Sequence, residues 1–187
     1  MDIGLNSCLR PYRELVDHVD RLLDGVRRRY PTDITCHKGC DCGCRNLSIL
    51  PVEALSVFMA VRALPAYTAV AVRRRAQANA FWHCPLLLDR ACELYPFRPI
   101  ICRTHGFPLQ TIYKGRTLIG HCRHNFYNRS AVPADALTDL DLINSSLRAV
   151  NTAFVRQITL RLPARLTLAE AVLLDSQISQ CFQSRKY

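Results

Sequence analysis

Apolar side chains recur at helical spacing in several segments of this chain, and prolines separate these segments. The first such segment lies between Pro11 and Tyr30, with apolar positions at Tyr12, Leu15, Val19, Leu22, Leu23 and Val26. This period predicts an amphipathic helix. Pro11 suits its first turn, and the three arginines at 27–29 complement the helix dipole near its carboxyl end. Pro31 ends it.

Two further helices are predicted in the middle of the chain. The first begins near Pro51, is capped by Ser48 or a neighbour, and ends at Pro65. Its predicted buried face consists of Ala54, Leu55, Phe58, Met59 and Leu64. The second runs from about Ala66 to Ala80. We expect it to bury Val70, Val72 and Ala76 and to turn the arginines at 73–75 outward.

A β-hairpin is predicted between Leu109 and Ile119, because two strand-like segments flank a Lys114–Gly115 turn. The last third of the chain is predicted to be helical. One helix runs from about residue 137 to 156, and another runs from a capping box at 167–170 to about residue 180. The predicted fold is therefore mainly α: a small helical bundle with a cysteine-rich irregular region and a short β-hairpin.

The composition agrees with this predicted fold and adds an indication of its chemistry. The 187 residues are 49% hydrophobic and 21% charged, as in a globular protein, and we expect one domain over 1–187. The sequence shows no secretory signal and no apolar run long enough to span a membrane, so we expect a cytoplasmic protein without a membrane partner. In that compartment, ten cysteines indicate metal or redox chemistry before disulfides.

Four of the cysteines fall within nine residues, in the pattern C-x3-C-x-C-x-C between Cys36 and Cys44. Thiolates crowded this tightly repel one another unless a metal ion or an iron–sulfur cluster holds them. Gly39 and Gly43 can take positive φ without strain, which lets the loop curl. The arginines at 27–29 place positive charge just before this loop, which favours thiolates.

A second group of cysteines follows in a segment that prolines interrupt. Cys84, Cys92 and Cys102 belong to it, and buried structural thiols remain the alternative interpretation there. Cys122, between His121 and His124, is a third source of ligands. Other features are assigned no ligand role: Trp82 is expected to pack in the core, and Cys8 and Cys181 are isolated.

The two cysteine segments together resemble the YkgJ-like cysteine-cluster proteins, a bacterial family described as zinc- or iron-chelating. The matching blocks are Cys36, Cys40 and Cys44-Arg45; Cys84-Pro85-Leu86-Leu87; Cys92-Glu93-Leu94-Tyr95; and Arg98-Pro99-Ile100-Ile101-Cys102-Arg103. The chain departs from the family in one place, where Cys42-Gly43-Cys44 replaces an adjacent cysteine pair. The resemblance covers residues 36–122 and implies a metal site, without implying one reaction. Some flagellin lysine methylases carry a similar region in a much longer chain, and methyl transfer is not carried over.

The predicted metal ligands are Cys36, Cys40, Cys42, Cys44, Cys84, Cys92, Cys102 and Cys122. All-cysteine ligation suits zinc and also iron in a [4Fe–4S] cluster. The ligands exceed one tetrahedral site, which leaves room for two zinc ions, for one cluster with spare thiols, or for two centres. Arg98 and Arg103 are predicted to donate hydrogen bonds to the thiolates.

Three functions follow, and the first is preferred. It is a cytoplasmic metal-binding protein in which the metal joins loops at one end of the bundle. The second is an iron–sulfur or metal-dependent enzyme of unknown substrate, with His105, His121 and His124 as proton carriers. The third is a basic zinc module that binds nucleic acid, suggested by the net charge of +10. No catalytic residue and no protein partner is identified.

Overall fold

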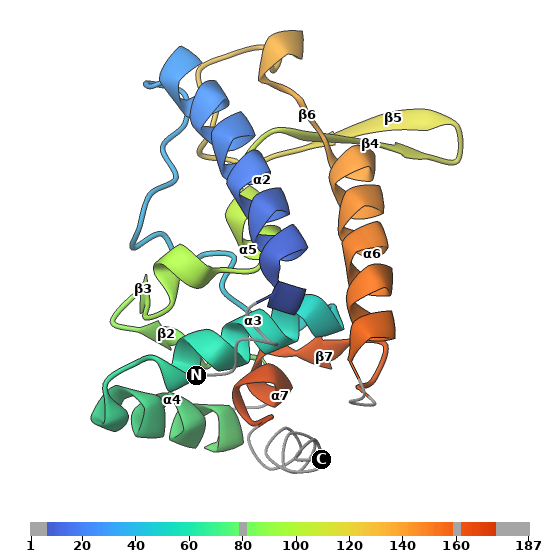
Figure 1. The fold of residues 1–187 in the computed structure, drawn as a ribbon. Coiled ribbons are helices and arrows are strands. Elements are labelled where there is room, and N and C mark those ends of the chain that lie inside the picture. Colours follow the sequence, from blue (N-terminus) through green and yellow to red (C-terminus); the bar gives the residue numbers. More distant parts are fainter. Residues whose placement is uncertain (1–6, 79–81, 159–161, 175–187) are drawn as a thin grey trace.

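The computed structural model describes residues 7–78, 82–158 and 162–174, and this part of the chain is mostly helical (Figure 1). Its α-helices are α2 (Arg10–Arg29), α3 (Pro51–Arg62), α4 (Ala66–Ala78), α5 (Ile100–Thr104), α6 (Leu140–Gln157) and α7 (Leu168–Val172). Two short 3-10 helices are η1 (Tyr95–Phe97) and η2 (Ala134–Ala136). The prediction of a mainly α fold is confirmed in this form.

Helix α2 matches its prediction closely. It has Pro11 in its first turn and three arginines in its last, and it buries Tyr12, Val19, Leu23 and Val26. Leu22 is an exception, with 41% of its surface exposed. At about 100° per residue, Leu22 lies at the edge of the stripe that Val19, Leu23 and Val26 form, and there it faces solvent.

Helix α3 is the central helix, and it packs against both α6 and α7. Nearly all its side chains are buried, including Val52, Leu55 and Phe58. Helix α4 is amphipathic and buries Val72 and Ala76, as predicted. Val70 does not belong to this buried face, because it is 47% exposed.

The prediction that the arginines of α4 all point outward is wrong for Arg75. Its side chain is only partly exposed, donates a 2.9 Å hydrogen bond from Nε to the carbonyl of Pro85, and pairs with Glu93. The spacing of apolar residues along α4 could not predict the contacts of Arg75, because Pro85 and Glu93 come from a segment that folds back onto the helix.

The predicted hairpin is present as β4 (Leu109–Tyr113) and β5 (Arg116–Gly120). Lys114 and Gly115 both have positive φ, at 50° and 73°, as a two-residue turn with the twist of a hairpin requires. Strand β6 (Thr138–Asp139) runs parallel to β4 and leads directly into α6. Helix α6 therefore begins at Leu140, three residues later than predicted.

Two more pairs of short strands connect distant loops. Strand β1 (Ser48–Ile49) pairs with β7 (Leu166–Thr167), and β2 (Leu87–Leu88) pairs with β3 (Ala91–Cys92). The capping box at Thr167 is confirmed, since Thr167 and Glu170 satisfy each other's backbone N–H groups. Helix α7 ends at Val172, and the predicted continuation over 175–180 lies outside the described residues.

The helices place two irregular segments, 31–47 and 82–99, next to each other on one side of α2 and α3 (Figure 1). An isolated antiparallel bridge between Arg45 and His83 joins the two segments. Together these segments carry six of the eight predicted ligands. Among the described helices, none has the length and apolar character needed to cross a membrane.

Candidate metal centre

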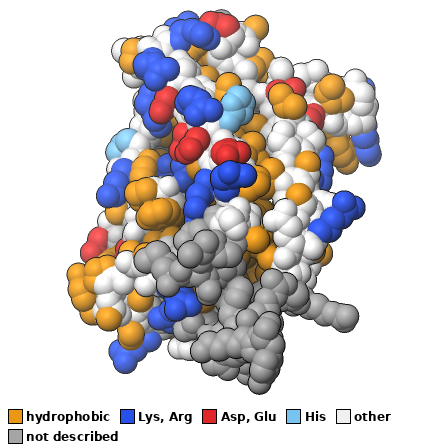
Figure 2. All heavy atoms as spheres, viewed as in Figure 1, with side chains coloured by type: hydrophobic (Ala, Val, Ile, Leu, Met, Phe, Trp, Pro, Cys, Tyr) orange, Lys and Arg blue, Asp and Glu red, His pale blue; other side chains and the backbone are white. Residues whose placement is uncertain are grey.

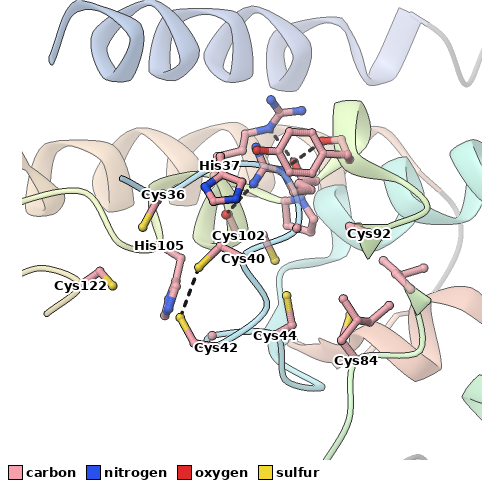
Figure 3. A pocket seen from close by; sticks show the side chains of 18 of the residues that line it. Cys36, His37, Cys40, Cys42, Cys44, Cys84, Cys92, Cys102, His105 and Cys122 are labelled. Atoms are coloured by element: carbon pink, nitrogen blue, oxygen red, sulfur yellow. Dashed lines mark hydrogen bonds between the residues drawn. The ribbon is translucent and has the colours of Figure 1, made fainter. Parts of the chain in front are cut away.

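A single pocket is lined by all eight cysteines that the sequence singles out (Figure 3). They come from the loop after α2, the segment before β2 together with strand β3, helix α5 and the segment after β5. Cys8 does not line this pocket and packs against the hydrophobic core instead. Cys181 lies outside the described residues. The fold thus brings together thiols that are up to 86 positions apart in the chain (122 − 36 = 86).

Four of these thiols form what we call the outer set: Cys36, Cys40, Cys42 and Cys122. The sulfurs of Cys40 and Cys42 are 3.5 Å apart. Burial and the neighbouring Cys122 raise the pKa of Cys36 to about 12, and a hydrogen bond with Cys40 raises the pKa of Cys42.

The other four thiols form the inner set: Cys44, Cys84, Cys92 and Cys102. The bridge between Arg45 and His83 places Cys44 across from Cys84, because the two segments run antiparallel. Burial raises the pKa of Cys84 to about 12, and the neighbouring Cys92 adds to this increase. Two backbone hydrogen bonds act in the opposite direction and lower the pKa. Burial also raises the pKa of Cys102, with Cys84, Cys92 and Cys44 as the next contributors.

The two glycines of the cysteine loop have different structural functions. Gly39 has a φ of 103°, as predicted. Gly43 does not use this freedom, since its φ is not positive. A Cβ atom at Gly43 would lie 1.8 Å from Nε2 of His105, so this glycine lets the imidazole pack directly against the backbone. Close approach of a side chain is the second reason for which a loop needs glycine.

Gly106 is a further glycine of the site that the sequence did not reveal. Its φ is 91°, its carbonyl accepts a 3.1 Å hydrogen bond from the N–H of Cys122, and a Cβ atom there would lie 2.8 Å from Sγ of Cys36. Gly106 therefore sits between two members of the outer set. The sequence does not indicate this contact, because an isolated glycine near a proline is typical of an ordinary turn.

Gly106→Ala is expected to weaken metal binding at the outer set by at least about tenfold, because the added methyl group displaces Cys36 and strains the backbone. Competition with a coloured chelator measures the affinity. Gly115→Ala is the matched control, since Gly115 also has positive φ but has open space around its Cβ position. Equal affinity in both variants would contradict this assignment.

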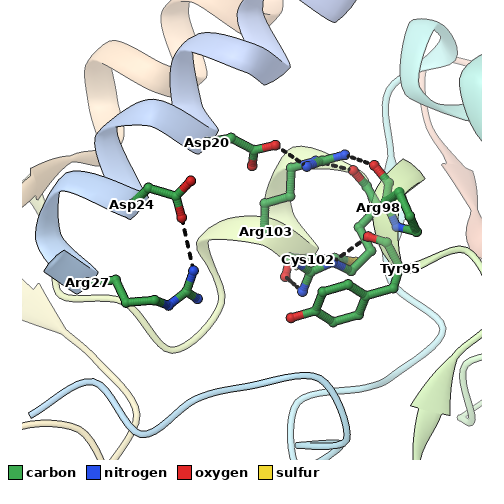
Figure 4. A network of polar contacts seen from close by, with 8 residues as sticks. Asp20, Asp24, Arg27, Tyr95, Arg98, Cys102 and Arg103 are labelled. Carbon is green, nitrogen blue, oxygen red and sulfur yellow. Dashed lines mark hydrogen bonds and ion pairs between the residues drawn. The ribbon is translucent and has the colours of Figure 1, made fainter. Parts of the chain in front are cut away.

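Arg98 and Arg103 were predicted to donate to thiolate sulfurs, and the structure shows them donating to backbone carbonyls (Figure 4). Arg98 lies 3.6 Å above the Tyr95 ring and donates to the carbonyls of Tyr95 and Cys102. Arg103 donates to the carbonyls of Arg98 and Pro96 and pairs with Asp20 of α2. The two arginines hold the shape of the segment that ends in Cys102.

Arg98 still acts on the thiols through its charge. Burial raises the pKa of Cys44 and of Cys92, and the Arg98 guanidinium opposes both shifts. Lys38 also opposes the shift at Cys92. The positive charge near the thiols thus comes from the cysteine segments themselves. The arginines at 27–29 contribute only Arg27 to the lining of the pocket.

Two buried polar residues support the site and carry no sequence signal as such. Glu53, only 2% exposed, accepts 3.0 Å hydrogen bonds from the N–H groups of Leu50 and Ile100, and so joins α3 to the start of the helix that carries Cys102. Asn125 is fully buried and donates to Sγ of Cys36 at 3.4 Å. Its Oδ1 atom also accepts from the N–H of Thr35.

The histidines divide into two groups. His105 and His37 line the cysteine pocket, whereas His121 and His124 do not. His121 interacts through Nδ1 with the carbonyl of Cys122 and meets the edge of Phe126. The prediction that Trp82 packs in the core is wrong, because Trp82 is 74% exposed.

The donor chemistry of the pocket fits a thiophilic metal. Within the described residues, the side chains as placed form no group of three or more His, Cys, Asp or Glu that could hold a metal ion. Each cysteine can turn its sulfur about one χ1 bond without moving the backbone. In a tetrahedral zinc site with Zn–S bonds of about 2.3 Å, the sulfurs are about 3.8 Å apart. The 3.5 Å between Cys40 and Cys42 is close to that value.

Comparisons with protein-family models, with curated proteins and with solved structures give no match for this chain.

Proposed function

We propose that this protein binds a thiophilic metal through its clustered cysteines, either as zinc or as iron in an iron–sulfur cluster. The observation that supports this most directly is the convergence of Cys36, Cys40, Cys42 and Cys122 from two segments that are far apart in the sequence. Four thiols in one place have little reason to meet in a core, since each is a small and weakly hydrophobic group. A zinc ion bound among four thiolates offsets their strong mutual repulsion.

The resemblance to the YkgJ-like proteins supports the same proposal, because it implies a metal site made from these cysteines. The metal would join loops that have little secondary structure of their own. Segment 31–47 contains no helix or strand among its described residues, apart from the single bridge at Arg45. Binding of the metal and ordering of these loops are therefore expected to be coupled.

Catalysis at the centre is the second candidate function, and one cavity favours it. This cavity of about 780 Å³ lies between α5, the β4–β5 hairpin and α6, and it reaches the outer set at His105, Gly106 and Cys122. A mostly apolar cavity next to a metal is where a small substrate would bind. A centre filled by four cysteines, unchanged on addition of candidate small molecules, would exclude this function.

Binding to nucleic acid is supported least. On the face drawn in Figure 2, acidic side chains lie among the basic ones over α2, so the surface there forms no continuous positive patch. Several arginines of the two runs are also engaged, with Arg27 paired to Asp24, Arg29 to Asp135 and Arg75 to Glu93. Each of these pairs reduces the charge available to phosphates.

Cys40→Ser is expected to lower the bound metal by about one ion per chain and the melting temperature by a few degrees, because a four-thiolate site loses one ligand. Elemental analysis and differential scanning calorimetry on the same samples measure both. Cys8→Ser is the control, since Cys8 lies outside the pocket. Unchanged metal content in both Cys40→Ser and Cys92→Ser would contradict the proposed function.

Metal binding is expected to release up to about four protons per ion near pH 7, because the ligands bind as thiolates. The raised pKa of Cys36 and of Cys84, about 12 in each case, means that these thiols carry their protons until the metal arrives. Affinity should therefore fall as the pH is lowered. Calorimetric titrations in buffers of different ionisation enthalpy count the protons, and a value near zero would contradict thiolate ligation.

A further inference from the structure

We infer that the inner set of Cys44, Cys84, Cys92 and Cys102 is a second, separate four-thiolate metal centre, and that it holds its ion structurally while the outer set exchanges its ion with solvent. This inference rests on the proposed metal binding and adds the number of centres, their ligands and their different accessibility. Zinc is the ion class that both sets would take. The backbone places the members of the inner set near one another, independently of where their sulfurs point.

Three separate backbone features bring the inner set together. The bridge between Arg45 and His83 sets Cys44 across from Cys84. The β2–β3 hairpin then returns the chain, with Cys92 paired to Leu87, three residues after Cys84. Helix α5 carries Cys102 to the same pocket, and its start is tied to α3 through the buried Glu53. Figure 3 shows Cys44, Cys84 and Cys92 on the side of the pocket away from Cys36 and Cys122.

The two sets differ in their surroundings. Three members of the inner set, Cys84, Cys92 and Cys102, pack against the hydrophobic core, whereas Cys44 is partly exposed and does not belong to that packing. In the outer set, Cys40 and Cys42 are exposed to solvent, and none of its members belongs to that packing. An ion bound by the inner set would be shielded from water and from chelators, whereas an ion bound by the outer set would be open to both.

Polar contacts hold the loops of the inner set from outside. Arg75 of α4 binds the carbonyl of Pro85 and the carboxylate of Glu93, one residue after Cys84 and Cys92 respectively. Arg103, only 7% exposed, fixes the segment before Cys102 through two carbonyls and Asp20. Such contacts around ligands usually change metal affinity by about 10- to 100-fold. Release from the inner set is therefore expected to be at least about tenfold slower than from the outer set.

The sequence of the cysteine loop agrees with this division. Cys42 belongs to the outer set and Cys44 to the inner set, and only Gly43 separates them. His105 lies directly against Gly43, so its imidazole stands at the boundary of the two sets. In an extended segment, residues two positions apart point to the same side. Here the N–H of Cys44 donates a hydrogen bond to the carbonyl of Asp41, and the resulting turn breaks that pattern.

The experiment counts the zinc ions in the full chain by native mass spectrometry and follows their release to 4-(2-pyridylazo)resorcinol. The inference predicts two ions and two release phases whose rates differ by at least about tenfold. Cys42→Ser should remove the fast phase and leave one slowly released ion. Cys92→Ser should remove the slow phase, and where this variant does not fold, titration of the wild-type protein with Co²⁺ gives the count by its thiolate absorption.

The outcomes are distinguishable. Two ions, with the fast one lost in Cys42→Ser, support the inference. One centre per chain, whether a single zinc ion or a single iron–sulfur cluster, would overturn the second centre and leave the proposed metal binding in place. Two ions released at equal rates would overturn the structural function of the inner set. Absence of any bound metal would overturn the proposed function as well.

Discussion

Cys84→Ser is expected to lower the melting temperature by at least roughly 10 °C, the largest effect of any single cysteine replacement in this chain. Structural zinc contributes about 10–16 kcal/mol of apparent binding free energy in small domains, and a missing ligand forfeits part of it. In a chain of this size each kcal/mol corresponds to about 2–4 °C, so a loss of about 4 kcal/mol gives the stated shift. Cys84 belongs to the inner set and packs against the core.

The control and the measurement follow from the same structure. Cys40→Ser changes an exposed thiol of the outer set and is expected to cost less stability than Cys84→Ser. Calorimetry at matched protein and zinc concentrations compares the two variants, with the metal content recorded for each. Equal melting temperatures for Cys84→Ser and wild type would contradict a stabilising ion at the inner set.

Arg103→Leu is expected to lower the free energy of unfolding by about 3 kcal/mol, because two backbone carbonyls and Asp20 lose their donor at once. Arg103 is 7% exposed, so water replaces these hydrogen bonds poorly. Leucine fills part of the space, so the loss reflects the hydrogen bonds more than a cavity. Urea denaturation of the zinc-loaded variants measures the effect.

Two variants separate the contributions at this position. Arg103→Lys keeps the charge but lacks the planar guanidinium that reaches both carbonyls and Asp20 at once, so it is expected to recover less than half of the lost stability. Asp20→Asn should cost less than about 1 kcal/mol, since the Asp20 side chain is 42% exposed. An Arg103→Leu variant as stable as wild type would show that this arginine does not hold the segment around Cys102.

The helices and the hairpin could be predicted because their signals are local. The spacing of Val19, Leu23 and Val26 specifies the buried stripe of α2, and Lys114–Gly115 specifies the turn between β4 and β5. Both depend on contacts within a few residues. Single positions such as Leu22 and Val70 were assigned incorrectly, because the width of a buried stripe depends on which neighbour packs against it.

The membership of the cysteine cluster was predictable from the sequence, whereas its internal division was not. Crowded thiols in irregular segments indicate a shared site, and the fold does bring all eight together. The division into two sets depends on the bridge between Arg45 and His83 and on the position of α5, which are contacts between distant segments. No local pattern encodes such contacts.

The residues that support the cysteines were not predicted, or were predicted to make other contacts, because their contacts also form only in the folded chain. Arg98 and Arg103 lie beside Cys102 in the sequence, which suggested hydrogen bonds to sulfur. Their guanidinium groups instead reach the carbonyls of the turn that they follow. Asn125 and Gly106 touch Cys36 only in the folded chain, and neither residue type announces a metal site on its own.

Elemental analysis with a visible absorption spectrum, on one sample purified without oxygen, tests the central claim most directly. We predict colourless protein with two zinc ions per chain. Iron with acid-labile sulfide and a broad band near roughly 400 nm, where cysteine-ligated clusters absorb, would replace zinc by an iron–sulfur cluster and favour the catalytic alternative. Protein that carries neither zinc nor iron, with its thiols reduced, would contradict metal binding by these cysteines.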